Sequence, residues 1–304
     1  MKLGLVSAIL PDLTFEEVID YVAGVGFECV EVCCWPKGKA VRRYAGVTHI
    51  DLEGLDAQKM AYYMDYAKEH GVSISSLGYY PNPLDPDKEA AAAAIDHIKK
   101  LISVSAEMGI GMVTTFIGRD KNKTIEENLE LFKTTWTPII KLAEEKKVKV
   151  AIENCPMLFT ANEWPGGNNL AASPAIWRQM FQLIPSDYFG LNYDPSHLCL
   201  IGASVTKPLY EFKDKIFHVH FKDVKIYQDK LDDHGHFAYP GLWHSPKLPG
   251  LGSADFGAFC SALYDIRFNG PACVEVEDKA FEGSLDLVKQ GIELSYRYLR
   301  QFII

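Results

Sequence analysis

Eight short apolar runs, rich in β-branched residues, alternate with amphipathic segments along the whole chain. Read as strands, the runs cover residues 2–8, 29–35, 73–79, 112–118, 149–154, 188–194, 216–223 and 272–277. The intervening segments have helical spacing and helix-start signals, such as the Thr cap and acidic first turn of TFEEVIDYVAGVG. Strict alternation favours parallel strands joined by right-handed crossovers. Eight such units in 304 residues predict a (β/α)8 TIM barrel, with a doubly wound sheet as the weaker alternative.

The chain shows no sign of a boundary between domains. No Ser/Gly-rich linker or shift in composition interrupts it, so we predict one barrel domain over residues 1–304. Two segments between elements are long, 155–173 and 224–254, and both follow predicted strands. Barrel enzymes carry their active sites at the C-terminal ends of the strands. These aromatic, Gly/Pro-rich segments are therefore predicted to form a substrate lid.

Composition excludes several classes of function. The formal net charge of −9 argues against binding to a nucleic-acid backbone. The N-terminus lacks the pattern of a signal peptide, and no apolar run is long enough for a membrane helix. The seven cysteines form no CxxC pair, which indicates reduced core residues in a reducing compartment. We expect a cytoplasmic protein that contacts no membrane and acts on a small molecule.

Four successive predicted strands end in side chains that can bind a metal ion. These are Glu153, Asp194, His220 and Glu275. In a barrel, such strand ends meet at one mouth although they are distant in sequence. Three carboxylates and one imidazole suit Mn²⁺, Mg²⁺, Co²⁺ or Zn²⁺, and the set lacks the thiolates of a closed structural zinc site. The sequence therefore predicts an open site for a divalent cation.

Taken singly, these residues have simpler explanations. Asp194 precedes Pro-Ser and could cap a helix. His218 and His220 share one face of a strand, where a lone histidine is more often a hydrogen-bonded core residue than a ligand. The coincidence of four successive strands favours the metal site.

Five motifs, in this order, carry a family resemblance: IENCP, DPSH, HVHFKD, PGLGSADFGAF and VEVED. Together they resemble the xylose isomerase-like barrel superfamily, in particular its sugar phosphate isomerase/epimerase branch, which includes ketose 3-epimerases and inosose dehydratase. The resemblance implies one bound divalent ion, Mn²⁺ ahead of the others, held by Glu153, Asp194, His220 and Glu275. It also implies that Glu153 and Glu275 are catalytic and that His197 faces the substrate.

The function implied by this resemblance is an epimerase or isomerase of a keto sugar or cyclitol. Proton transfer by the two glutamates would pass through a metal-stabilised enediolate. The alternative is a metal-dependent lyase or dehydratase that acts on an oxidised sugar, such as an inosose or a 3-keto glycoside. A third reading is a sugar-binding barrel without catalysis. The five motifs do not choose among these outcomes or identify the carbohydrate.

Residues in the two long segments, together with Lys222, are predicted to contact the substrate. Ketose 3-epimerases typically carry an arginine shortly after the strand-seven histidine, and here Lys222 could replace it. The other predicted contacts are Trp164, Asn168, Trp243 and His244. Their alternative role is packing of the loops on one another. The aromatic loops could also contact a second copy of the chain and form a homo-oligomer.

A second metal site is a weaker possibility. His234, His236 and His244 lie close together in the sequence and could complete one, although a DDHGH turn is more often solvated. The ends of the third and fourth strands read LGYYPN and TTFIGR and carry no histidine. The superfamily's three-zinc DNA-repair endonuclease needs histidines there, so the sequence disfavours a nucleic-acid enzyme.

Overall fold

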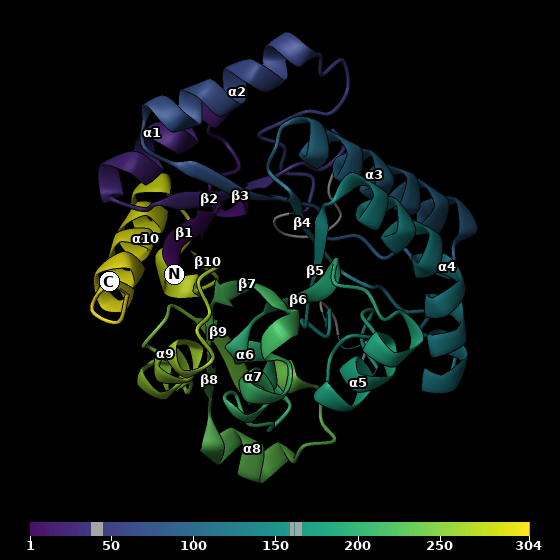
Figure 1. The fold of residues 1–304 in the computed structure, drawn as a ribbon. Coiled ribbons are helices and arrows are strands. Elements are labelled where there is room, and N and C mark those ends of the chain that lie inside the picture. The colour runs from purple at the N-terminus through teal and green to yellow at the C-terminus, as the bar shows by residue number, and fades with distance from the viewer. Residues whose placement is uncertain (38–44, 159–160, 162–165, 304) are drawn as a thin grey trace.

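Eight parallel strands close into a barrel, and helices surround it (Figure 1). The computed structural model describes residues 1–37, 45–158, 161 and 166–303. The ring runs in the order β1-β10-β7-β6-β5-β4-β3-β2. Its strands are β1 (Lys2–Val6), β2 (Cys29–Cys33), β3 (Ser73–Gly78), β4 (Met112–Thr115), β5 (Lys149–Glu153), β6 (Phe189–Tyr193), β7 (Ile216–Phe221) and β10 (Pro271–Val274). The predicted (β/α)8 barrel is confirmed, and the doubly wound alternative is wrong because β1 pairs with β10.

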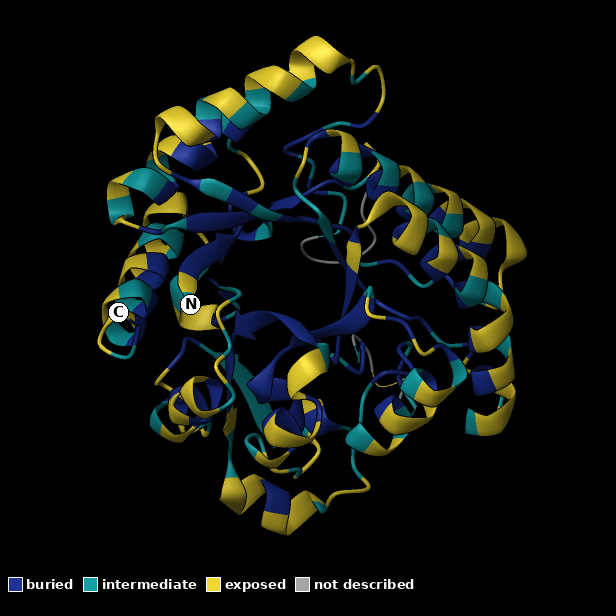
Figure 2. Cartoon of the chain, in the orientation of Figure 1, coloured by how far each residue is buried: buried dark blue, intermediate teal, exposed yellow. Residues whose placement is uncertain are grey.

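The helices form where the sequence predicts them, to within a few residues. They are α1 (Phe15–Val25), α2 (Ala57–Glu69), α3 (Lys88–Glu107), α4 (Ile125–Lys146), α5 (Pro174–Leu183), α7 (Lys207–Glu211), α9 (Phe256–Asp265) and α10 (Leu285–Arg300). Thr14 and Thr124 begin α1 and α4 with capping boxes, in which the threonine and a glutamate three residues later satisfy each other's backbone N–H groups. The barrel strands are mostly buried, and the helices expose their outer faces (Figure 2).

A short extra helix follows β6 directly. This helix, α6 (Pro195–Leu200), begins at Asp194, whose Oδ1 accepts a hydrogen bond of 2.7 Å from the backbone N–H of Ser196. Pro195 at the first helical position needs no N–H partner. The helix turns the chain immediately at the barrel mouth and keeps Asp194 and His197 at the end of β6.

The segment after β7, predicted as a lid over residues 224–254, contains regular secondary structure that the sequence did not indicate. It contains β8 (Asp223–Ile226), α8 (Gln228–His234) and β9 (His244–Lys247), and β8 and β9 form an antiparallel pair apart from the barrel. β7 ends at Phe221, whereas we predicted a strand that continues to Asp223. Strands of four residues with sequences DVKI and HSPK carry too little alternation to be recognised.

Asp223 holds together the two ends of residues 224–254, a segment that we call the excursion between β7 and α9. Its buried carboxylate accepts hydrogen bonds from the backbone N–H groups of Val224, Gly250, Gly252 and Ala254, at 2.7, 3.1, 2.9 and 3.0 Å. A carboxylate can accept several such bonds at once, so one side chain ties the two ends of the excursion together. The chain then enters α9 from a fixed position.

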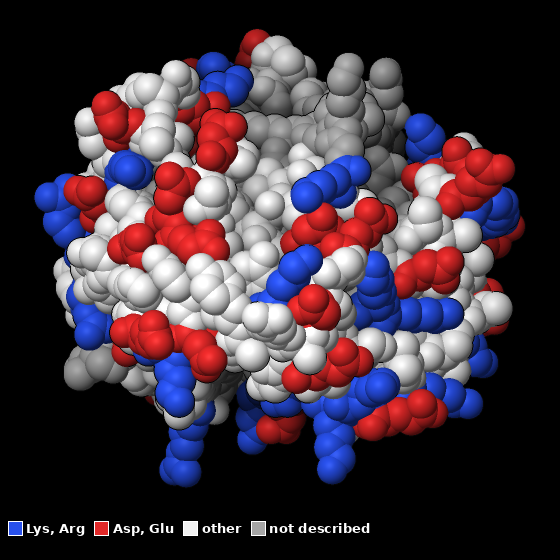
Figure 3. All heavy atoms as spheres, turned by 90° about the horizontal axis from the view of Figure 1, so that it is seen from above, with Lys and Arg blue, Asp and Glu red and all other residues white. Residues whose placement is uncertain are grey.

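Two further predictions concern the chain as a whole. All seven cysteines are free, and five of them are buried, as predicted for reduced core residues. Among the described residues, no helix combines the length and apolar character that a membrane span needs. On the face shown in Figure 3, acidic and basic side chains are mixed over the described surface.

Candidate metal centre

A cavity of about 380 Å³ opens at the C-terminal ends of the barrel strands. One part of its wall is largely apolar and includes Val6, Cys33, Trp35, Tyr80 and Phe116. The other lining residues include the charged side chains Glu153, His197, Lys222, Glu275 and Glu277. A concave, mostly apolar pocket with converging polar groups is typical of a small-molecule site.

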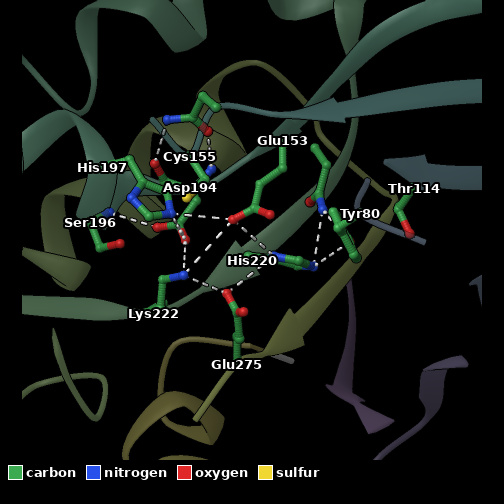
Figure 4. A network of polar contacts seen from close by, with 12 residues as sticks. Tyr80, Thr114, Glu153, Cys155, Asp194, Ser196, His197, His220, Lys222 and Glu275 are labelled. Atoms are coloured by element: carbon green, nitrogen blue, oxygen red, sulfur yellow. Dashed lines mark hydrogen bonds and ion pairs between the residues drawn. The ribbon is translucent and has the colours of Figure 1, made fainter. Parts of the chain in front are cut away.

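The four predicted metal ligands meet in the charged part of this cavity. Glu153 ends β5, Asp194 follows β6, His220 lies in β7 and Glu275 follows β10. One donor atom from each lies within 4.8 Å of the donor atoms of the others (Figure 4). Glu153, Asp194 and His220 are buried, and the Glu275 side chain is 21% exposed. The structure therefore brings together all four side chains.

Two buried atoms of this group have no hydrogen-bond partner among the residues that the structure describes. These are Oδ2 of Asp194 and Nδ1 of His220. Buried polar atoms without partners are rare and call for a specific explanation, such as a bound ion. Asp194 uses Oδ1 to cap α6, so the cap that we considered as an alternative is present, and Oδ2 still faces the other donors. Three carboxylates and one imidazole fit a divalent cation.

Lys222 lies against the same carboxylates. Its Nζ is 2.7 Å from Oε2 of Glu275 and 3.4 Å from Oδ2 of Asp194. Oε2 of Glu277 and Oε1 of Glu153 lie 3.5 and 3.8 Å from the same nitrogen. The buried ammonium group therefore neutralises part of a dense negative charge.

The ionisation of these groups follows from burial and from their mutual attraction. Burial alone would raise the pKa of Glu153 and Glu275, but Lys222 and His220 outweigh it, and the pKa of Glu275 falls to about 2 and that of Glu153 well below its usual range. Burial would lower the pKa of Lys222, yet Glu275 and Glu277 hold it well above its usual range. Burial likewise opposes the charged form of His220, but Glu31, Glu153 and Glu275 raise its pKa well above its usual range. A cation at Nδ1 would therefore replace a proton there.

His197 lies at the cavity and also contacts the donor group. Its Nε2 is 3.2 Å from Oε1 of Glu153 and 3.3 Å from Oδ2 of Asp194. Burial would lower the pKa of His197, but Cys155 and Asp194 raise it well above its usual range. Cys155 is half-buried and lines the cavity, unlike the core cysteines that we predicted.

The other predicted substrate contacts divide into three groups. His244 lines the cavity, as Lys222 and His197 do. Trp243 and Asn168 do not: Trp243 is 2% exposed and packs between the rings of His236 and His244. Trp164 lies outside the described residues.

The segment that contains Asn168 shows why its position differs from the prediction. The backbone N–H of Asn168 donates to the carbonyl of Pro156, and the side chain of its neighbour Asn169 donates to the carbonyls of Glu153 and Cys155. The backbone of Asn168 and the side chain of Asn169 thus hold this segment against the end of β5 and the residues that follow it. Loop packing, the alternative that we considered, describes Trp243 and Asn168.

The second metal site has little structural support. His234 ends α8, and His236 packs edge-on against Trp243. Within the part of the chain that the structure describes, neither joins a group of three or more side chains able to hold an ion.

Sequence reasoning missed the polar residues beneath the donor group. Glu31 in β2 is fully buried and contacts His220 from across the barrel, and the Tyr80 hydroxyl donates to Glu31. The available signal was a glutamate inside the apolar run CVEVCCW, where an ionisable residue needs a partner.

Comparisons with known proteins agree with this architecture. The chain matches the model of a family described as "Xylose isomerase-like TIM barrel" over residues 19–300. It is 25% identical over 239 residues to the uncharacterized protein YfiH of Bacillus subtilis (strain 168), which covers 74% of each chain. It is 29% identical over 113 residues to inosose dehydratase of Lacticaseibacillus casei, which covers 36% of this chain and 38% of that protein.

A solved structure with the same fold is D-psicose 3-epimerase with D-tagatose from Clostridium cellulolyticum H10. Its TM-score is 0.72 at 15% identity, and the match covers 100% of this chain and 99% of that chain. Because the family model matches nearly the whole length of the chain, this protein belongs to the xylose isomerase-like TIM barrel family.

Proposed function

We propose that this protein is a divalent-metal-dependent epimerase or isomerase of a keto sugar or cyclitol. The observation that carries the proposal is the convergence of donor atoms from Glu153, Asp194, His220 and Glu275 within 4.8 Å. Two of these residues have buried donor atoms that make no hydrogen bond to any described residue. These four side chains would hold the ion, with Mn²⁺ as the first candidate. When bound, the ion would act as a Lewis acid on a substrate carbonyl and acidify the neighbouring C–H group.

Glu153 and Glu275 are the candidates for proton transfer. Their low pKa keeps both ionised at neutral pH, so either can accept a proton from the substrate. Epimerisation also needs a proton donor on the opposite face of the same carbon. The other glutamate fills this role once it has taken up a proton from Lys222 or from water, and its donation inverts the carbon. Return of a proton to the adjacent carbon interconverts a ketose and an aldose.

The remaining cavity residues would orient the substrate. Lys222 and His197 carry N–H groups beside the donor set and could donate to substrate oxygens. The apolar wall, with Trp35 and Phe116, would cover the C–H face of a sugar and exclude water. The free cysteines support a cytoplasmic location for this activity.

Dehydration is the second candidate function. It is favoured by the match to inosose dehydratase, which is 29% identical over 113 residues. After the same proton removal, loss of a β-hydroxyl group as water would give an enone. The donor set itself is compatible with either outcome.

Incubation in deuterated water tests both functions. The protein, loaded with Mn²⁺, is incubated with a panel of ketoses and inososes, and the products are examined by NMR and mass spectrometry. Deuterium in a stereoisomer or constitutional isomer supports the first function, and a product that has lost water supports the second. His220→Asn removes one of the four donors and should lose either conversion, and Glu28→Gln, which lies outside the cavity lining, is its control. A protein that binds no divalent ion and transforms no substrate would refute the proposal.

A further inference from the structure

The two ring nitrogens of His220 face chemically different groups. Nδ1 lies 3.6 Å from Oε1 of Glu153 and 3.4 Å from Oε2 of Glu275, and it makes no hydrogen bond within the described part of the chain. Nε2 points the other way, into the barrel, where Oε2 of Glu31 is 3.0 Å away. An imidazole that binds a cation through one nitrogen must carry its remaining proton on the other. The partner of Nε2 therefore decides whether Nδ1 is available.

Glu31 is held rigidly in the position that Nε2 faces. It lies in β2, across the barrel from β7, and is fully buried. The Tyr80 hydroxyl donates to Oε1, which leaves Oε2 for His220. Gly78 in β3 leaves room for the carboxylate, because a Cβ atom at that position would lie 2.7 Å from Oε1 of Glu31. Nε2 of His218 approaches the same carboxylate oxygen, at 3.6 Å from Oε2 of Glu31.

Asn192 also approaches Nε2 and could in principle compete. Its Nδ2 lies 3.0 Å from Nε2 of His220, and its Oδ1 lies 2.9 Å from Nδ1 of His218. If Nε2 were an acceptor for this amide, its lone pair would also face the negative charge of Glu31, which is repulsive. A proton on Nε2 turns the Glu31 contact into a charge-assisted hydrogen bond. The amide of Asn192 can then donate to the Tyr80 hydroxyl at 3.3 Å.

We propose that Glu31 is a positioning residue that keeps a proton on Nε2 of His220 and so reserves Nδ1 for the divalent cation. This inference rests on the proposed function, since it concerns the same metal site. Glu31 is not one of the four donors proposed for the cation and does not line the cavity. Its effect passes through the orientation and protonation of one ligand, as is common for histidine ligands whose second nitrogen donates to a carboxylate.

Metal affinity is the first test, and it is measured by calorimetry with Mn²⁺. Glu31→Leu should weaken binding about 10- to 100-fold. Glu31→Gln should weaken it less, because the amide oxygen can still accept from Nε2–H. Gly78→Ala should also weaken binding, because the added methyl group displaces the Glu31 carboxylate without altering its chemistry. Glu28→Gln is the matched control. Glu28 directly precedes β2, and its carboxylate contacts Leu3 and Arg300 and not His220.

The second test needs no metal. In the metal-free protein, NMR of ¹⁵N-labelled histidine should show a protected, downfield Nε2–H proton for His220, identified by its loss in His220→Asn. The signal should persist in Glu31→Gln and disappear in Glu31→Leu. Circular dichroism and thermal unfolding of each variant verify that it is folded.

The two tests separate failure of this inference from failure of the metal site. A wild-type protein that binds no cation would refute the proposed function, while the Nε2–H signal would still decide the role of Glu31. A Glu31→Leu variant that binds Mn²⁺ as tightly as the wild type, or that retains the protected proton, would overturn the inference. So would a loss of affinity in Glu31→Gln as large as in Glu31→Leu.

Discussion

The ammonium nitrogen of Lys222 lies 2.7 Å from Oε2 of Glu275, at the edge of the group of atoms that we assign to a divalent cation. The same nitrogen approaches Oδ2 of Asp194, an oxygen that accepts no hydrogen bond from the described residues. Lys222 and the cation would therefore be attracted by the same oxygens and would repel each other. This relationship gives Lys222 an influence on metal binding in addition to its predicted contact with the substrate.

Replacement of Lys222 by methionine should tighten metal binding. Removal of a positive charge next to a divalent ion favours the bound ion by Coulomb attraction to the remaining carboxylates, and we expect a gain of at least about tenfold in affinity. Calorimetry with Mn²⁺ measures the change. Lys225→Met is the control, because Lys225 is exposed on the neighbouring strand β8. Weaker binding in Lys222→Met would show instead that the ammonium group holds the carboxylates in place.

The two proposed proton-transfer residues should be separable by isotope exchange. In Glu153→Gln and Glu275→Gln, overall turnover should fall by about 10²- to 10⁴-fold, the usual contribution of a general base. The remaining glutamate can still remove a proton and return deuterium to the same face, so each variant should label one stereoisomer only. Metal content is measured in parallel, because both residues are also proposed ligands. Labelling of both stereoisomers by a single variant would contradict the two-base assignment.

Asp223 should contribute to stability more than its surface neighbours do. Asp223→Ala leaves four backbone N–H groups at the base of the excursion without an acceptor, and we expect a loss of about 3 kcal/mol in the free energy of unfolding. Asp255→Ala removes one exposed bond at the start of α9 and should cost about 1 kcal/mol. Urea denaturation of both variants measures the difference. Equal losses would mean that the excursion closes without Asp223.

Acid should lower the free energy of unfolding of the metal-free protein, because Glu275 becomes protonated. The pKa of this carboxyl group falls from an ordinary value of 4.5 to about 2 in the folded protein, so the folded state favours the ionised form. The resulting stabilisation is present above about pH 4.5 and is lost as the pH falls through about 2. The stability advantage of the wild type over Glu275→Gln should therefore shrink between these values in chemical denaturation experiments. An advantage independent of pH would show that Lys222 does not stabilise the ionised carboxyl group.

The barrel could be predicted from the sequence because its strands are buried on both faces. Runs such as those around Ile152 and Leu191 are apolar without interruption, and Gly, Pro or polar residues mark their ends. The positions of Glu153, Asp194, His220 and Glu275 followed from the same pattern, because each lies at or near the C-terminal end of a strand. Their convergence is observed, and their role as ligands stays a prediction.

Other parts of the site could not be predicted because they depend on contacts across the barrel. Glu31 and His220 are 189 positions apart, and nothing local to either residue indicates that they form a hydrogen bond. The cavity contacts of Trp243 and Asn168 were predicted from residue type alone. The position of Trp243 depends on the pairing of the short polar strands β8 and β9. The position of Asn168 depends on backbone hydrogen bonds in the segment before α5.

The hydrogen bonds of Asp223 also have a consequence for how substrate specificity could change in this fold. Residues 225–249 lie between two points that one carboxylate holds together, and within them His244 and Pro246 reach the cavity. Because its two ends are held together, the segment can be lengthened, shortened or replaced while β7 and α9 keep their positions. We therefore expect transplanted versions of this segment to alter which carbohydrate is accepted while cation affinity stays the same.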